Sequence, residues 1–281
     1  MELWICYAIL SGIFVSLREL YIKKYIEQSP EIISFTTRFY GSIIFIIIAL
    51  RGNVIITDIP VFIGITLLTV IITAVATLIR LKLIKAEDLS LTTPWLGSVP
   101  IFVVLWSMLL YQELPSAFAL FGIVLVCAGA FIINLHGNRI RVSKSSIWMI
   151  LVAIMLGFTT SVDKLAIGVS SAITYSLLWT IASAVLMFGI ARTKTRRVLI
   201  VDKHLVFQAV LWVIEFLMQM LAVQNISQIA SGQTYVKTLT MLNIVITTVI
   251  SSILFREKER RKRIISAVLI FVGAVIVILN R

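Results

Sequence analysis

The ionisable residues that lie within apolar segments are the most informative feature of this sequence. Glu215 stands in the run VFQAVLWVIEFLMQMLAV, and Lys237 stands near the start of TYVKTLTMLNIVITTV. A charged side chain in the middle of a membrane costs about 2.5 to 3.5 kcal/mol on insertion scales, so it normally faces a partner or a water-filled cavity. The two residues predict a substrate-binding or coupling site, or else a buried ion pair that only joins two helices.

Glu215 and Lys237 each continue a polar stripe along one face of an expected helix. Glu215 lies about 4.5 Å beyond the centre of its helix and Lys237 about 6 Å before the centre of the next, at 1.5 Å per residue. Both groups are therefore expected at nearly the same depth, where they can meet or face one ligand. The stripe residues, several of which are predicted to line the same site, are Gln208, Trp212, Glu215 and Gln219 in one helix, and Gln233, Lys237, Thr240 and Thr247 in the other.

Two pairs of neighbouring charges occupy equivalent positions late in two expected helices. They are Arg18 with Glu19, and Asp163 with Lys164. Glu19, Asp163 and Lys164 are candidates for a gate or a coupling group, although side chains this far from a helix centre can also reach the membrane interface. Arg38, near the start of another apolar run, is open to the same alternatives and could hold an anionic group.

Two prolines, Pro94 and Pro100, fall inside one expected helix. Each removes a backbone donor and frees carbonyl groups that a neighbouring helix or water must satisfy. With Trp95 and Gly97 between them, this segment is predicted to bend beside the site, with Trp95 among the binding residues; a packing kink is the alternative. Glu113, after the same helix, is expected to be structural because a carboxylate favours the positive end of the following helix.

Small and hydroxyl residues also recur at helical spacing. A threonine stripe predicts hydrogen bonds between helices rather than a path for a ligand, and two small faces predict close helix packing or a dimer contact. These residues are Thr66, Thr69, Thr73 and Thr77 in the stripe, Gly122 with Gly129 in one small face, and Ser266 with Gly273 in the other.

The composition explains where these residues must be placed. The chain has 281 residues, of which 60% are hydrophobic and 14% charged, and its mean hydropathy is +1.06. Soluble domains are less apolar and more charged, so the sequence predicts an all-α integral membrane protein. The net charge of +12 gathers in loops, which indicates membrane topology rather than nucleic-acid binding. Cys6 and Cys127 lie in apolar runs and predict no disulfide.

Apolar windows predict ten transmembrane helices. Residues 144 apart are alike at both ends of the chain, as in Glu19 and Asp163 or Gly129 and Gly273, which predicts two repeats, 1–137 and 145–281. Because each repeat has an odd number of spans, the second copy enters the membrane upside down, and inverted repeats place a substrate site between them. The expected spans are 3–25, 31–50, 58–79, 86–110, 115–135, 146–166, 171–191, 202–222, 228–255 and 263–280.

The loop charges predict an orientation. Of the 25 Lys and Arg residues, 19 fall in connections on one side of the membrane, and three, Arg51, Lys164 and Arg281, fall on the other. Loops rich in Lys and Arg stay in the cytoplasm, so both termini are expected to be extracytoplasmic in the plasma (cytoplasmic) membrane.

The segment LSLTTPWLGSVPIFVVLWSMLLYQELPSAFALFGIVLVCAGAFIIN resembles the fourth and fifth helices of EamA-type proteins of the drug/metabolite transporter superfamily. The second half repeats it as TYVKTLTMLNIVITTVISSILFREKERRKRIISAVLIFVGAVIVILN, and TTSVDKLAIGVSS is similar to the Asp-Lys pair and small-residue turn of that family. The resemblance covers the whole chain and implies two five-helix repeats and a transport function. Ten-helix members are usually drawn with both termini inside, opposite to the charge count here.

Enzyme signatures such as G-x-S-x-G, H-E-x-x-H and a Walker motif are missing, so we expect neither catalysis nor a cofactor or metal. The sequence predicts a transporter that exports a small metabolite by alternating access, as a monomer or homodimer, with a proton or an exchange substrate as coupling partner. An amino-acid-like zwitterion is the favoured substrate, with Lys237 meeting the carboxylate and Glu215 the amine or a proton. A lipid-linked head-group flippase and a non-transporting membrane scaffold are the alternatives.

Overall fold

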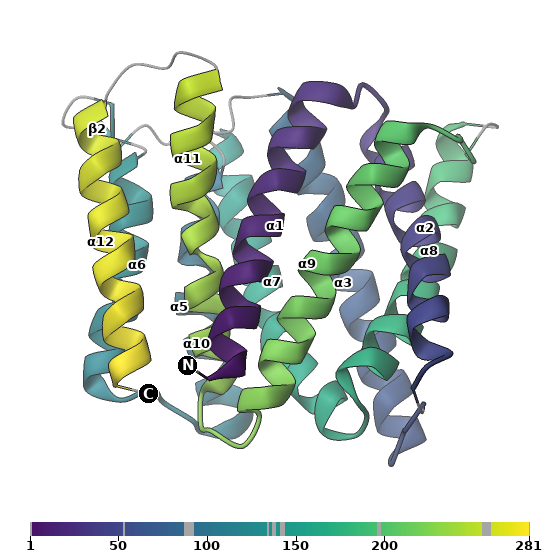
Figure 1. Cartoon of the computed structure of the whole chain (residues 1–281), viewed down its shortest axis with the longest axis horizontal. Coiled ribbons are helices and arrows are strands. Elements are labelled where there is room, and N and C mark those ends of the chain that lie inside the picture. Colours follow the sequence, from purple (N-terminus) through teal and green to yellow (C-terminus); the bar gives the residue numbers. More distant parts are fainter. Residues whose placement is uncertain are drawn as a thin grey trace.

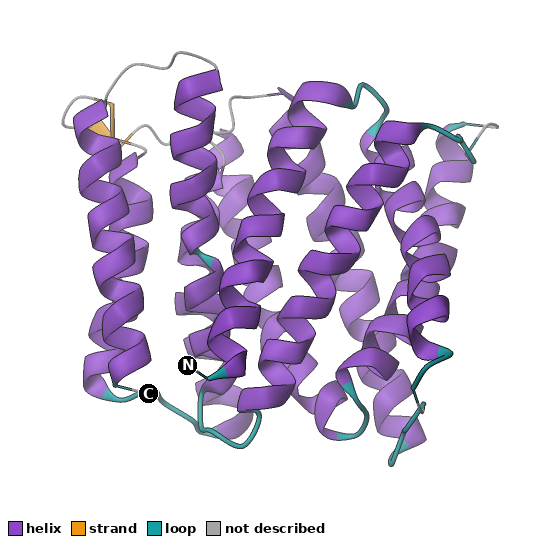
Figure 2. Ribbon diagram, in the orientation of Figure 1, coloured by secondary structure: helices purple, strands orange, loops and turns teal. Residues whose placement is uncertain are grey.

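The computed structural model describes residues 2–52, 54–86, 93–133, 135–136, 139–140, 144–195, 198–254 and 260–280. This part of the chain is a bundle of helices with one short hairpin (Figures 1 and 2). The helices of the first half are α1 Leu3–Tyr25, α2 Pro30–Ala49, α3 Ile59–Ala86, the 3₁₀ helix η1 Thr93–Ser98, α5 Val99–Tyr111 and α6 Ala117–Ile133. The hairpin pairs β1 Leu135–His136 with β2 Arg139–Ile140. The helices of the second half are α7 Lys144–Gly168, α8 Ala172–Lys194, α9 Lys203–Ile226, α10 Gly232–Thr240, α11 Leu242–Leu254 and α12 Arg260–Leu279.

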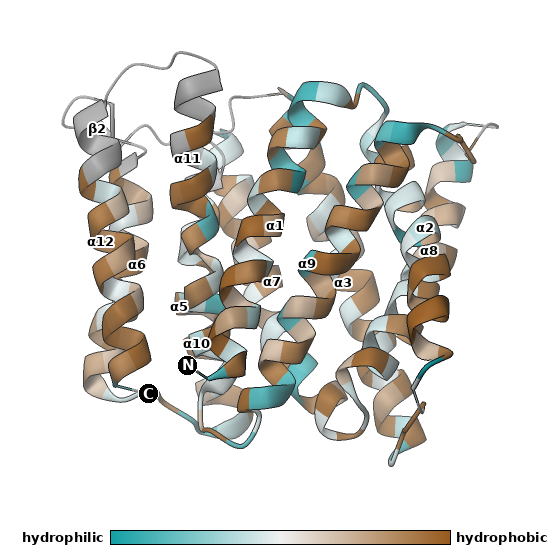
Figure 3. Cartoon of the chain, viewed as in Figure 1, coloured by the Kyte–Doolittle hydropathy of each residue, from teal (hydrophilic) through white to brown (hydrophobic). Residues whose placement is uncertain are grey.

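Six of these helices, α1, α2, α3, α7, α8 and α9, are long and apolar enough to cross a membrane, and shorter apolar helices accompany them. The outward surface is consistent with a lipid environment. On α3, for example, Ile63, Leu67 and Ile71 are spaced four residues apart and are 50%, 52% and 55% exposed. Figure 3 shows apolar residues along the middle of the helices and hydrophilic residues mostly toward the two ends of the bundle. The chain is therefore an integral membrane protein of the all-α class.

Two of the expected spans are interrupted. The segment expected at 86–110 consists of η1 followed by α5, and residues 87–92 lie outside the described part of the chain. Pro100 stands in the first turn of α5, where a missing N–H costs nothing, so the prediction of a kink inside a continuous helix is wrong. Pro94 belongs to η1 instead of a continuous α-helix. The segment expected at 228–255 breaks at Met241, between α10 and α11.

The packing of the helices repeats about a two-fold relation between the halves. The contact between α1 and α9 is matched by that between α7 and α3, and the contact of α2 with α9 by that of α8 with α3. Helix α1 begins at the marked N-terminus, whereas β2, which precedes α7, lies at the opposite end of the bundle (Figure 1). Equivalent helices thus run in opposite directions, as inverted repeats require.

Close packing of α6 against α12 follows from the predicted small faces. A Cβ atom at Gly122 would lie 2.7 Å from the carbonyl oxygen of Gly273, and one at Gly129 would lie 2.9 Å from that of Ser266. Gly122 and Ser266 are equivalent under the 144-residue offset, as are Gly129 and Gly273, so the contact is itself two-fold symmetric. Both small faces are used within the chain, so these two faces are not free to form a dimer contact.

Because backbone fills this space, Gly122→Val is expected to destabilise the protein by about 1 to 3 kcal/mol through overpacking. Gly64→Val is the matched control, since nothing lies within 4 Å of a Cβ atom at Gly64. The measurement is thermal unfolding of the two purified variants in detergent. Equal unfolding temperatures for both variants would contradict this account of the α6–α12 contact.

Candidate functional site

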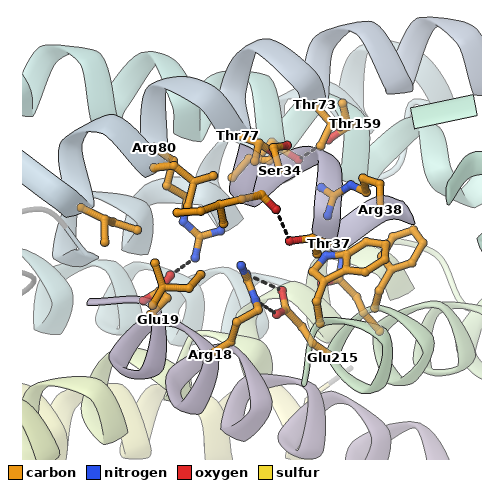
Figure 4. Close-up of a pocket in the computed structure, with 18 of the residues that line it drawn as sticks. Arg18, Glu19, Ser34, Thr37, Arg38, Thr73, Thr77, Arg80, Thr159 and Glu215 are labelled. Atoms are coloured by element: carbon orange, nitrogen blue, oxygen red, sulfur yellow. Dashed lines mark hydrogen bonds and ion pairs between the residues drawn. The ribbon is translucent and has the colours of Figure 1, made fainter. Parts of the chain in front are cut away.

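A cavity of about 120 Å³ lies between the two halves and is lined by α1, α2, α3, α7, α8, α9 and α10. Since a site of about 10 to 15 Å³ is enough for one water, this cavity can accept a small metabolite. Seven charged residues line it (Figure 4 shows five of them): Arg18, Glu19, Arg38, Arg80, Asp163, Glu215 and Lys237. Ser34, Thr37, Thr73, Thr77, Thr159, Thr160 and Gln219 add polar lining.

One ion pair in the cavity joins α1 to α9. The Arg18 guanidinium donates from Nε to Glu215 Oε2 at 2.5 Å and from Nη2 to Glu215 Oε1 at 3.1 Å. Only about a tenth of each side chain is exposed. Such a bidentate contact fixes both planes and neutralises both charges. Glu215 is thus paired with Arg18 and not with Lys237. Of the two arrangements that the sequence left open, the direct contact is not formed, and both groups line one cavity.

A second ion pair joins α1 to α3. Arg80 contacts Glu19, whose side chain is 1% exposed. The sequence count placed Arg80 in a loop because the apolar window ends at this first charge. The structure instead continues α3 to Ala86, and Arg80 points into the cavity (Figure 4). Without Arg80, the sequence count gives 18 cations rather than 19 on the charge-rich side, which leaves the bias intact.

Arg38 is held by aromatic rings instead of a carboxylate. Its guanidinium carbon lies 4.1 Å from the ring centroid of Trp212 and 5.2 Å from that of Trp179. Its Nε donates to Ser183 Oγ at 3.3 Å, and the residue is 5% exposed. Phe216 stacks on Trp212 with centroids 5.1 Å apart. A cation over an aromatic face is attracted by the ring, so the buried Arg38 side chain rests on the two tryptophans and does not extend to the membrane interface.

Asp163 ends a buried chain of hydroxyl groups. Tyr175 donates its hydroxyl to Asp163 Oδ1 at 2.5 Å, and the same hydroxyl lies 3.1 Å from Thr69 Oγ1. Trp179 Nε1 donates to Thr69 Oγ1 at 3.1 Å. The chain runs through α7, α8 and α3 and fixes the carboxylate at the cavity wall. The prediction of hydrogen bonding for Thr69 fits this arrangement.

The charges of the cavity do not balance. Four cations and three carboxylates line it, which leaves a formal charge of +1. Within the described residues, ion pairs closer than 4 Å join Arg18 to Glu215 and Arg80 to Glu19, whereas Arg38, Lys237 and Asp163 form none. In the same part of the chain, no cluster of three or more His, Cys, Asp or Glu residues is arranged to hold a metal ion.

Three predicted site residues lie away from this cavity. Gln233 is buried between α10 and α5, where Nε2 donates to Ser107 Oγ at 2.8 Å. Trp95 packs edge-on against Phe131, with centroids 5.3 Å apart. Lys164 does not share a site with its neighbour Asp163 and instead binds Glu113 at 2.7 Å. The other candidates, Glu19, Arg38, Asp163, Trp212, Glu215, Gln219 and Lys237, line the cavity.

The sequence carried one signal that would have found Arg80. The threonine stripe proceeds in steps of four residues from Thr69 through Thr73 to Thr77, and a further step of three reaches Arg80. Thr73, Thr77 and Arg80 all line the cavity. The C-terminal half of the stripe therefore faces the site, contrary to its interpretation as helix packing.

A helical membrane bundle with inverted halves and a charged cavity at their interface is a transporter architecture. The EamA-like transporter family model matches residues 2–135 and 143–279, so the chain belongs to this family. Its members are membrane transporters of the drug/metabolite type. No curated protein sequence matches the chain. A solved structure, described as "Crystal structure of protein", is 14% identical, covers 99% of this chain and 97% of its own, and has a TM-score of 0.73, which shows the shared fold.

Proposed function

We propose that this protein is a secondary transporter that moves an amino-acid-like zwitterion out of the cell by alternating access. Its ten apolar segments cross the plasma membrane, and a proton or an exchange substrate drives it. The proposal depends on one observation. Cations and carboxylates without an ion-pair partner, Arg38, Lys237 and Asp163, face one cavity between the repeats. A zwitterion carries the complementary charges.

The roles differ from those expected from the sequence. Glu215 already binds Arg18, so Asp163 is the better partner for a substrate ammonium group. Lys237 receives the carboxylate, as the sequence suggested. A charged group in a membrane is stable only with a partner or with water, so substrate and solvent alternate as partners of Lys237 and Asp163.

Alternating access needs closures at both ends of the cavity. At the end that holds the termini, Glu113 accepts hydrogen bonds from Lys164 Nζ at 2.7 Å and from the backbone N–H of Ser231 at 2.7 Å. At the other end, Lys23 Nζ donates to the carbonyl oxygen of Ile84 at 2.9 Å and ties α1 to α3. Polar contacts of this kind can break and reform as the halves rock.

The function is tested with purified protein in liposomes that are loaded with a mixture of unlabelled amino acids and diluted into one radiolabelled amino acid. Uptake or counterflow of a zwitterionic amino acid above that of empty liposomes supports the proposal. Lys237→Met is expected to lower the rate about a hundredfold, because a buried hydrogen-bonded charge contact is worth about 2 to 5 kcal/mol. Absence of transport for every amino acid, with redistribution of a lipid-linked sugar instead, would favour a flippase.

The proposed orientation makes a separate prediction. Because the sequence count without Arg80 assigns 18 cations to the side of the membrane opposite the termini, a reporter fused after Arg281 should be extracytoplasmic. An alkaline phosphatase fusion is expected to be active there, and a green fluorescent fusion dark. A bright fluorescent fusion with a silent phosphatase would reverse the assignment.

A further inference from the structure

The cavity charges that are not neutralised by an ion pair within the protein indicate a narrower substrate class than zwitterions in general. Arg18 is neutralised by Glu215, and Arg80 by Glu19. The remaining groups on the cavity wall are two cations, Arg38 and Lys237, and one carboxylate, Asp163. A simple zwitterion has one negative and one positive group and would leave one cation unmatched.

Arg38 is built to receive an acidic group. The stack of Trp212 and Trp179 orients its guanidinium, and its hydrogen bond to Ser183 uses only Nε. An arginine guanidinium carries five N–H donors in a planar fork that matches a carboxylate. In Figure 4, Arg38 lies apart from the pairs Arg18–Glu215 and Arg80–Glu19, and among the described residues it forms no ion pair within 4 Å.

A buried hydroxyl adds to this part of the cavity. Ser34 precedes Arg38 by one helical turn on α2, is 1% exposed and lines the cavity. Among the described residues, Ser34 Oγ has no hydrogen-bond partner. Buried hydroxyl groups are normally hydrogen-bonded, so an acceptor on a bound molecule would complete this one.

The aromatic support of Arg38 also breaks the two-fold relation between the repeats. Under the 141-residue offset that holds for this region, Arg38 is equivalent to Trp179, and Ser42 to Ser183. Helices α2 and α8 pack against each other, so these equivalent positions meet. The first half therefore has a cation at this position, and the second half has the aromatic ring that supports it. The two halves of the cavity wall thus differ in charge.

We propose that the preferred substrate is an acidic amino acid or a close analogue, with two carboxylates and one ammonium group. This inference rests on the proposed function and specifies it. Arg38 binds the side-chain carboxylate, Lys237 the α-carboxylate, and Asp163 the ammonium group. The substrate charge of −1 cancels the cavity charge of +1, so that no charge remains unmatched when the membrane-embedded site closes.

The test compares isosteric ligands on the full-length protein in liposomes. Counterflow of radiolabelled L-glutamate is competed with L-glutamate, L-glutamine, L-aspartate and L-asparagine. Each acid is expected to compete about tenfold better than its amide, the scale of one charge-assisted contact. Arg38→Gln should remove this preference by weakening the acids while the amides compete as before, and Arg38→Lys should retain part of it. Arg51→Gln, at an exposed cation outside the cavity, is the control.

The outcomes separate the two proposals. If amides compete as well as acids while amino acids are still transported, the acidic-substrate inference is overturned and the transport proposal stands. If Arg38→Gln weakens acids and amides equally, Arg38 is structural and the inference is overturned. If no amino acid of any class is transported, both proposals fail. Should Arg38→Gln not fold, the comparison of acids with amides on the unmodified protein decides the question.

Discussion

Replacing Glu215 with glutamine is expected to lower the free energy of unfolding by about 3 to 5 kcal/mol and to abolish transport. The Arg18–Glu215 pair is almost fully buried, and removing one partner leaves an uncompensated charge inside the bundle. The double variant Arg18→Gln/Glu215→Gln should recover most of the stability, since no unpaired charge remains. The measurement is unfolding in mixed micelles at increasing denaturant, together with counterflow in liposomes.

The second substitution that restores the stability lost in Glu215→Gln shows which cation Glu215 binds. In the structure Glu215 binds Arg18, so Glu215→Gln/Lys237→Met should remain as unstable as Glu215→Gln alone. Lys82→Gln is the control for removing a charge at the surface. Its side chain is 63% exposed and 3.9 Å from Glu31, a contact worth less than about 1 kcal/mol. Rescue by Lys237→Met but not by Arg18→Gln would show that the buried pairing is different.

The sequence predicted the bounds of the membrane helices well where capping residues or prolines stand at the helix ends. The expected span 3–25 coincides with α1, and the span 31–50 differs from α2 by one residue at each end. At α2, Ser29 caps the helix by accepting a hydrogen bond from the backbone N–H of Ile32, and Pro30 begins it. Capping residues and the length of an apolar run can both be recognised from residues that are close together in the chain.

The pairing of the charges could not be predicted in this way. Hydropathy alone cannot distinguish Arg80 in a loop from Arg80 in a buried helical turn, because its partner Glu19 lies 61 positions earlier. Depth along the membrane suggested that Glu215 and Lys237 could meet, but depth fixes one coordinate only. The rotation of each helix about its axis, which depends on packing, directs Glu215 toward Arg18.

Inverted symmetry carried more information than the sequence comparison used. The spacing of Gly12 and Ser16 in α1 recurs in α7 as Gly157 and Ser161, shifted by one residue from the 144-residue offset that relates Glu19 to Asp163. Ser16 Oγ donates to the carbonyl oxygen of Asn243 at 2.9 Å, next to the break between α10 and α11. Ser161 Oγ donates to that of Val103 at 3.3 Å in α5. Each repeat thus uses the same glycine and serine spacing to hold the interrupted segment of the other.

Disruption of the contact around Glu113 is expected to expose the cavity to the extracytoplasmic side. Glu113 binds Lys164 of α7 and the backbone N–H of Ser231, the residue before α10. Ser231 has a left-handed backbone with φ of 58°, a conformation that a non-glycine residue keeps only when its surroundings hold it. Glu113→Gln removes the ion pair and weakens the bond to Ser231, so the populations should shift toward the outward-open state.

Accessibility measures that shift directly. In a Cys6→Ser/Cys127→Ser background, a single Thr159→Cys substitution places a thiol on the cavity wall. Glu113→Gln should raise its rate of labelling by a membrane-impermeant maleimide, added from the side of the termini, about tenfold, which corresponds to about 1.4 kcal/mol. Lys203→Gln, at an exposed cation at the start of α9, is the control. If labelling and transport are both unchanged by Glu113→Gln, the contact only joins helices. Lys237 lies on α10, six residues after Ser231. The proposed opening would therefore also move the cation that we propose as the substrate's partner, which would link release of the contact to release of the substrate.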